Sequence, residues 1–122
     1  MSDGVLVREL PDGGSEFVLE NPVLSTLVVD GGLTLRFGRT EVAVAGPCSL
    51  ELDGVSHRLD PRVPHTLAPL LSCIPGTARW LWSSTDGSLT VVLMQGQRLV
   101  VPGRPVPSPW TVGGRSGQVR QS

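Results

Sequence analysis

The stretch Val29-Asp30-Gly31-Gly32-Leu33-Thr34-Leu35-Arg36-Phe37, which runs on to Val42-Ala43-Val44, decides the fold because the chain contains its pattern twice. An Asp-Gly pair between alternating apolar residues favours a tight β-hairpin turn. In both copies a glycine turn and a valine-rich run follow, so the repeat predicts two related antiparallel β-meanders. The shared positions are Asp30, Gly31, Leu33 and Thr34 in the first copy and Asp86, Gly87, Leu89 and Thr90 in the second.

A two-residue turn at each Asp-Gly pair fixes which side chains oppose each other across the first two strands. Side chains alternate between the two faces of a strand, so each set of opposed pairs shares one face. Both sets are almost entirely apolar and therefore predict the core face, with Trp80 and Trp82 inside. The predicted pairs are Leu24–Phe37, Thr26–Leu35 and Val28–Leu33 in the first copy, and Trp80–Leu93, Trp82–Val91 and Ser84–Leu89 in the second.

A second turn leads into the third strand of each meander. Gly38-Arg39 fits a type II′ turn, which places Arg36 opposite Glu41 as an ion pair on the outer face. Gln95-Gly96-Gln97 is one residue longer and predicts a three-residue loop with a residue at positive φ. The predicted core pairs are Leu35–Val42 and Leu33–Val44 in the first copy, and Leu93–Leu99 and Val91–Val101 in the second.

Between the copies, a third Asp-Gly pair, Asp53-Gly54, predicts another hairpin. The predicted inward pairs are Leu52–Val55, Leu50–His57 and Cys48–Leu59. A short helix is expected near residues 66–74, with Thr66 or His65 as its N-cap and Pro69 in the first turn. Its predicted apolar face comprises Leu67, Leu70, Leu71 and Ile74.

These patterns divide the chain into three parts. Residues 1–22 predict an N-terminal arm or an edge hairpin, and residues 23–103 form the duplicated β domain. Residues 104–122 are a Pro/Gly-rich tail that we expect to be disordered after about residue 112. Trp110 is the tail's anchor, and docking on its own domain is favoured over docking on a partner because an exposed tryptophan is costly.

Composition excludes several functional classes. The chain has 122 residues and a net charge of −1, and its arginines are scattered, which argues against nucleic-acid and anionic-membrane binding. The N-terminus lacks the features of a signal peptide and no apolar run is long enough for a membrane helix, so a cytoplasmic location is expected. Cys48 and Cys73 lack a CxxC spacing and are expected to be free thiols.

Candidate chemistry is sparse. Cys48 and His57 share one face of the predicted hairpin, which makes a nucleophilic pair conceivable, but a regular hairpin lacks the strained elbow or helix terminus that activates a thiol. Cys48, His57, His65 and Cys73 also lack a short chelating spacing for a metal. We expect no cofactor, no metal and no enzyme activity. A small enzyme or ligand binder that uses Cys48, His57 and His65 stays the alternative.

Surface patterning gives the best functional lead. The predicted outer face of the second meander is apolar, whereas that of the first carries Arg36 and Glu41. A sheet with two apolar faces is covered on both, and coverage by the same chain is favoured slightly over a second subunit or a foreign protein. The candidate partner-binding residues are Leu81, Val92, Met94, Val100, Arg36, Glu41 and Trp110.

The chain also resembles a family of small uncharacterised proteins, largely from actinomycetes. The likeness runs from Val23 to Trp110 and rests on Asp30–Phe37, His57–Pro61, Leu67–Leu71 and the Asp86–Thr90 repeat. In the family an aromatic-acidic pair precedes the tryptophan and a further strand follows it, whereas Ser108-Pro109 stands here. The resemblance implies no activity, only that small β-rich proteins of this sort act as partner-binding or immunity-like proteins.

Together these observations predict a mainly β protein in which two meanders and one short helix pack as a sandwich or half-open barrel. The function expected is non-catalytic protein binding, including neutralisation of a toxin-like or enzymatic partner, or self-association as a homodimer.

Overall fold

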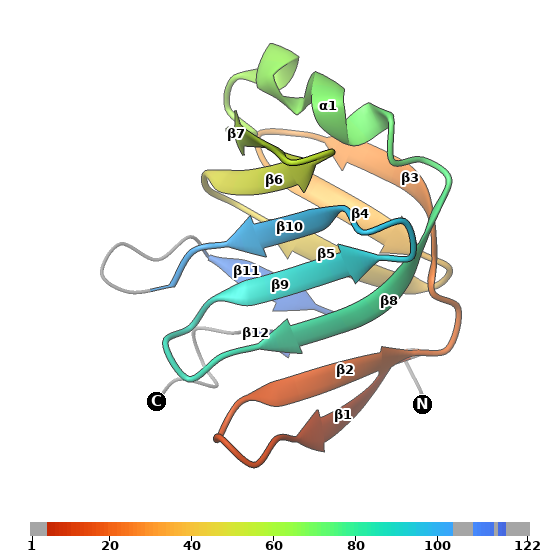
Figure 1. Cartoon of the computed structure of the whole chain (residues 1–122), viewed down its shortest axis with the longest axis vertical. Coiled ribbons are helices and arrows are strands. Elements are labelled where there is room, and N and C mark those ends of the chain that lie inside the picture. Colours follow the sequence, from red (N-terminus) through yellow and green to blue (C-terminus); the bar gives the residue numbers. More distant parts are fainter. Residues whose placement is uncertain (1–4, 104–108, 114, 117–122) are drawn as a thin grey trace.

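A computed structural model of the chain describes residues 5–103, 109–113 and 115–116. It is a mainly antiparallel β structure with one short helical segment (Figure 1), as the sequence predicts. The strands form one continuous path, in the order β12-β11-β5-β4-β3-β8-β9-β10-β6-β7, that folds over without closing into a barrel. The β1–β2 hairpin joins this path at β8.

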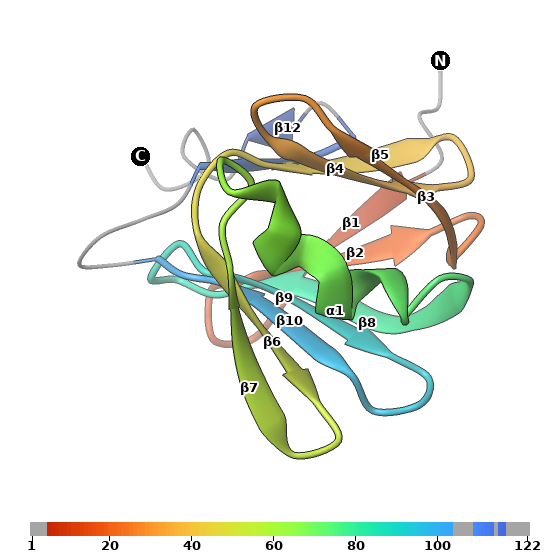
Figure 2. The same ribbon diagram turned by 90° about the horizontal axis from the view of Figure 1, so that it is seen from above.

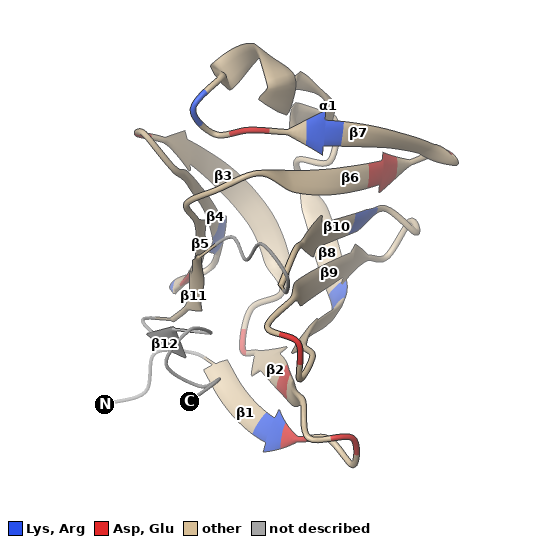
Figure 3. Ribbon diagram, turned by 90° about the vertical axis from the view of Figure 1, so that its left-hand side faces the viewer, with Lys and Arg blue, Asp and Glu red and all other residues tan. Residues whose placement is uncertain are grey.

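Two layers face each other across the core, and Figures 2 and 3 show them from above and from the side. Both predicted meanders are present, one in each layer, and the Asp53-Gly54 hairpin extends the second layer. The first layer contains β3 (Val23–Val29), β4 (Leu33–Phe37), β5 (Thr40–Val44), β11 (Trp110–Val112) and β12 (Arg115–Ser116). The second contains β8 (Gly76–Ser83), β9 (Leu89–Leu93), β10 (Arg98–Val101), β6 (Cys48–Leu52) and β7 (Val55–Leu59).

Strand β8 connects the two layers because one of its edges pairs with different strands at its two ends. Its first residues pair with β3, Thr77 opposite Val23, and its last residues pair with β2, Ser83 opposite Ser15. The N-terminal segment is thus an edge hairpin, β1 (Val5–Glu9) and β2 (Ser15–Leu19), attached to the second layer.

The Asp53-Gly54 hairpin matches its prediction pair by pair. Leu52 opposes Val55 and Leu50 opposes His57, as expected for a two-residue loop. Both loop residues have positive φ, 53° at Asp53 and 79° at Gly54, which is the type I′ geometry.

In the two meanders the Asp-Gly turns are longer than predicted. In the first, Asp30, Gly31 and Gly32 all lie in the loop, so Val29 opposes Leu33. The predicted pairs Val28–Leu33 and Thr26–Leu35 are therefore wrong by one residue. A bulge at Ser25 restores the predicted pair Leu24–Phe37, and the Gly38 turn gives the predicted pairs between β4 and β5.

In the second meander the loop spans residues 84–88, and Ser83 opposes Leu89. A one-residue slip moves every side chain of a strand to the opposite face. Leu81 is consequently buried, with 1% of its surface exposed, whereas Trp80 is 46% exposed. The prediction that Trp80 and Trp82 form the core is wrong, and so is the prediction that Leu81 lies on the outer face.

The next loop has the predicted three residues but lies one residue earlier in the chain, at residues 94–96, because the Leu93 amide donates to the Gln97 oxygen. Leu99 opposes Val91 rather than Leu93, and Val101 opposes Leu89. A shift of two residues keeps the same faces, so Leu99 and Val101 are buried as predicted. Gly96 has the expected positive φ, 94°.

The helical segment is shorter than predicted. It consists of the 3-10 turn η1 (Pro64–Leu67) and α1 (Ala68–Leu71), with Pro69 in the first turn as expected. Thr66 does not cap it; its hydroxyl instead donates to Val63 and accepts a hydrogen bond from the Asp60 amide. Leu67 and Leu70 are buried, but Leu71 is exposed because a single α-helical turn cannot direct all predicted apolar residues inward.

Trp110 anchors the C-terminal segment to the domain, as predicted. The ring is 2% exposed, and its Nε1 donates a 2.8 Å hydrogen bond to the Gly87 oxygen in the turn between β8 and β9. It also packs edge-on against Phe17 of β2, with ring centroids 6.1 Å apart. The expectation of disorder after about residue 112 fails for Arg115–Ser116, which pair with β11. Residues 104–108, 114 and 117–122 lie outside the described residues.

Candidate binding surface on the outer face of the second layer

Two tryptophans stand on the outer face of the second layer. Trp82 lies directly opposite Glu16 of β2 and Thr90 of β9, and Trp80 lies opposite Val92 of β9. Opposed residues of antiparallel strands share a face, so these side chains form one continuous surface, which we name the tryptophan face. Its members are Glu16, Trp80, Trp82, Thr90, Val92, Arg98 and Val100.

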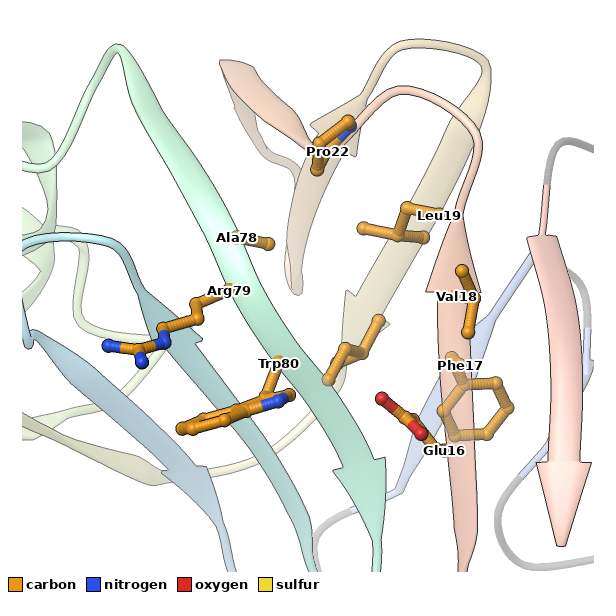
Figure 4. A pocket seen from close by; sticks show the side chains of 9 residues that line it. Glu16, Phe17, Val18, Leu19, Pro22, Ala78, Arg79 and Trp80 are labelled. Atoms are coloured by element: carbon orange, nitrogen blue, oxygen red, sulfur yellow. The ribbon is translucent and has the colours of Figure 1, made fainter.

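The tryptophan face is hollowed where β2 leaves β8. Only Ser15 and Glu16 of β2 pair with β8, and beyond them a gap of ≈ 200 Å³ opens between the strands. Phe17, Leu19 and Ala78 line this gap, and Glu16 and Trp80 lie across it from one another (Figure 4). A second hollow of ≈ 260 Å³ lies on the same face and is lined by Leu10, Glu16, Trp80 and Trp82.

Charged groups lie around the tryptophans, and one of them, Arg79, lies over the Trp80 ring. Arg8 donates a 2.9 Å hydrogen bond to the Glu16 carboxylate. The Arg79 guanidinium lies 4.6 Å from the centre of the Trp80 ring, a cation–π contact. Both interactions are on the surface, where an ion pair contributes little to stability. They leave the indole rings accessible and the surface mixed in charge.

The predicted binding residues separate into exposed and buried groups. Met94 is exposed, Val100 is half-buried and Val92 is buried in the sheet face between its neighbours. Leu81 and Trp110 are buried in the core and do not reach the surface.

Arg36 and Glu41 are brought together on the outer face of the first layer. The Arg36 Nε donates to Glu41 Oε2 at 2.9 Å, which confirms the predicted ion pair. This pair and the tryptophan face belong to different layers, so the structure does not combine all predicted binding residues into one site.

Sequence reasoning missed the main residues of the tryptophan face, namely Glu16, Trp80 and Trp82. The signal was present, since two tryptophans at alternate positions share one face of a strand. The sequence did not reveal the length of the 84–88 loop, and this length decides whether the tryptophans lie on the inner or the outer face of the layer.

The candidate nucleophile is poorly suited to catalysis. Cys48 is buried, and burial, followed by the charge of Asp60, raises the pKa of its thiol to about 12. The raised pKa disfavours the thiolate, which is the nucleophilic form, at neutral pH. Burial also raises the pKa of Cys73. His57 lies on the inner face opposite Leu50, as predicted, and is half-buried at the edge of the layer.

Within the described part of the chain, no three His, Cys, Asp or Glu side chains are grouped so as to hold a metal ion. None of the helices in that part is long and apolar enough to cross a membrane.

The chain belongs to DUF6188, a family of unknown function, which matches residues 16–120. This match confirms the resemblance to an uncharacterised family and extends it on both sides. Comparison with curated proteins and comparison with solved structures returned no match.

Proposed function

We propose that this protein is a non-catalytic binding module that docks on a protein partner through the tryptophan face. The observation that carries the proposal is the position of Trp80, which is 46% exposed on a sheet face. Interface hot spots are enriched in tryptophan because its ring buries a large area at little entropic cost. Since Trp80 is not part of the core, packing of the core does not explain a tryptophan at this position.

The surroundings of Trp80 suit the recognition of another protein. Hollows of ≈ 200 Å³ and ≈ 260 Å³ flank it and accept side chains of the partner. Glu16 on one side and Arg79 on the other supply one charge of each sign at the rim. An apolar centre with a polar, charged rim is the usual anatomy of a specific interface.

The alternative, a small enzyme or ligand binder that uses Cys48, His57 and His65, has weaker support. The protonated Cys48 thiol lacks the reactivity that a nucleophile needs. Neutralisation of a toxin-like or enzymatic partner in the cytoplasm is the narrower form of the binding proposal. The cytoplasm is reducing, so it would keep Cys48 and Cys73 as free thiols, as they are in the structure.

Affinity capture with matched baits tests the proposal. The intact chain, the Trp80→Ala variant and the Arg36→Ala variant are used as baits in extracts of the native host, and bound proteins are quantified by mass spectrometry. We expect a protein that the intact chain and Arg36→Ala retain equally and that Trp80→Ala retains at least about tenfold less. Equal retention by all three baits would refute docking through the tryptophan face.

The enzyme alternative has its own test. A Cys48→Ala/His57→Ala variant that still captures the partner and supports the phenotype of the native host would remove it. Loss of the phenotype with partner capture intact would instead favour chemistry at these residues over binding.

A further inference from the structure

Strand β7 is the outer edge of the second layer. In the part of the chain that the structure describes, β7 is the last strand of the order and pairs with β6 alone, so no strand lies along its other side. Figure 2 shows it at the rim of its layer, with α1 beside the interior and the outer edge of β7 open. This edge takes no part in the tryptophan face.

The two-residue turn at Asp53-Gly54 decides which backbone groups of β7 point outward. The residues that flank such a turn, Leu52 and Val55, exchange hydrogen bonds, and bonded residues alternate along the strand. The amide and carbonyl groups of Ser56 and Arg58 therefore point away from β6. Within the described residues, no loop or neighbouring strand supplies a backbone hydrogen bond to either residue.

Natural proteins usually protect such an edge with proline, lysine, a bulge or a covering segment, because a regular free edge pairs with other strands. β7 contains no proline, its one charged side chain is that of Arg58, and its pairing with β6 continues without a bulge through five residue pairs. Val55 on this strand is 55% exposed. The strand is built as a pairing edge.

We propose that β7 pairs with β7 of a second copy of this chain, antiparallel about a twofold axis at His57, to form a homodimer with a continuous sheet. In this register Ser56 opposes Arg58 of the second copy. These are the residues whose free backbone groups point outward, so each pair exchanges two hydrogen bonds across the axis. Val55 then lies opposite Leu59 of the second copy and loses its exposure to water.

Charge complementarity supports a second copy as the occupant of this edge. Glu51 lies opposite Ser56 on the outer face, and the register places Arg58 of the second copy next in the same row. The backbones of Glu51 and that arginine are then about 10 Å apart, two strand spacings, a span that their long side chains bridge over the small Ser56. In the isolated chain Glu51 lies opposite Arg98 of β10 on its other side. Hydrogen bonds from Arg62 and, to a lesser extent, the charge of Arg58 lower the pKa of Asp60. Neither Glu51 nor Arg58 forms an ion pair with a described residue. Because the dimer has twofold symmetry, it contains two such pairs, one on each side of the axis.

Sedimentation velocity of the purified full chain over a range of concentrations tests the proposal. We expect a monomer–dimer equilibrium. Ser56→Pro removes an amide that points to solvent in the monomer, so it should abolish the dimer while the monomer keeps its circular dichroism spectrum.

Charge variants give a second, independent measurement. Arg58→Glu and Glu51→Arg should each raise the dimer dissociation constant at least about tenfold, because each places like charges together. The double variant Glu51→Arg/Arg58→Glu should restore the wild-type value to within about threefold. Arg36→Glu, which breaks an ion pair of the first layer, is the matched control and should leave the dimer unchanged.

A monomeric wild-type chain at all concentrations would overturn the proposal. A dimer that persists in Ser56→Pro and in both single charge variants would also overturn it, and loss of that dimer in Trp80→Ala would assign it to the tryptophan face instead. If Ser56→Pro does not fold, the charge variants decide, and failure of the double variant to restore the dimer contradicts the register.

Discussion

The two meanders share the same Asp-Gly signal, yet they place their first strands differently. In both, the loop is longer than the two-residue turn that the sequence suggests, and the register slips by one residue. In β3 a bulge at Ser25 corrects the slip before the core is reached, so Leu24 still opposes Phe37. In β8 the correcting irregularity comes only at Arg79, beyond Trp80, so both tryptophans face outward. The position of one bulge therefore determines which meander carries an exposed aromatic surface.

The two turns also differ in what touches them. A Cβ on Gly31 would meet no heavy atom within 4 Å, so the tip of the first turn is free of tertiary contacts, although Gly32 lies against the backbone of Val44. The second turn is held from two sides: the Trp110 Nε1 donates to the Gly87 oxygen, and the Gly103 backbone lies against Asp86 and Ser88. The Asp86 carboxylate also accepts a hydrogen bond from the Ser88 amide, an alternative to the type I′ turn.

Removing Trp110 should have the largest effect on this comparison. Trp110→Ala deletes a buried ring between the layers and the donor that holds the second turn, and we expect a loss of about 3–5 kcal/mol of unfolding free energy. Urea denaturation measures it. Trp110→Phe is the control: it keeps a ring next to Phe17 and loses only the hydrogen bond, so it should cost less, about 1–3 kcal/mol. Equal losses in the two variants would contradict the role of the ring.

Alanine substitutions at matched glycines should separate the two turns. In Gly103→Ala the new Cβ would lie 2.1 Å from the Asp86 oxygen, a backbone atom, so the second turn must shift, at a cost of about 1–3 kcal/mol. Gly31→Ala meets no neighbour and pays only for its positive φ of 70°, about 1 kcal/mol. Chemical denaturation of both variants in parallel checks the order, and a larger loss for Gly31→Ala would show that the second turn is not held by Gly103.

How much of this structure the sequence predicts depends on whether a turn is decided locally. The Asp53-Gly54 hairpin is predicted in every pair because Asp53 and Gly54 themselves supply the two positive φ angles of a type I′ turn. The Gly38 turn is predicted for the same reason. Local chemistry was sufficient for the strands up to Val101, the ion pair of Arg36 with Glu41 and the two-layer class of fold, but not for β11 and β12, which lie in the predicted tail.

The tryptophan face was beyond such reasoning because it depends on the length of the 84–88 loop and on the position of the bulge in β8, which lies beyond Trp80. Gly103 and Trp110 contact the turn that precedes β9, and in β8, which leads into this turn, Trp80 lies outside and Leu81 inside. The local sequence near residue 86 does not predict these contacts. Alternation along the strand correctly grouped Trp80 with Trp82, but assigning that group to the core required a loop length that tertiary contacts set.

Deletions within the loops should sharpen the comparison further. Removing Gly32 leaves Asp30-Gly31 as a two-residue turn and keeps Val29 opposite Leu33, so the free energy of unfolding should change by less than about 1 kcal/mol. Removing Ser88 deletes the amide that bonds Asp86 and the carbonyl that bonds the Ser84 amide, and should cost about 1–3 kcal/mol. Urea denaturation again supplies the measurement, and equal tolerance of both deletions would mean that the hydrogen bonds of Ser88 do not fix the second turn.

The smallest effect on stability is expected at Trp80, where solvent quenching of fluorescence gives the sharper test. Trp80 is 46% exposed and Trp110 is 2% exposed. Acrylamide should therefore quench much of the wild-type emission, Trp80→Phe should lose most of the quenchable part, and Trp110→Phe should keep it. Trp80→Phe should change the free energy of unfolding by less than about 0.5 kcal/mol, as expected for a surface position. The register predicted from a two-residue turn would instead bury Trp80. Wild-type emission that resists quenching, together with a large destabilisation by Trp80→Phe, would support that register and would contradict the existence of the tryptophan face.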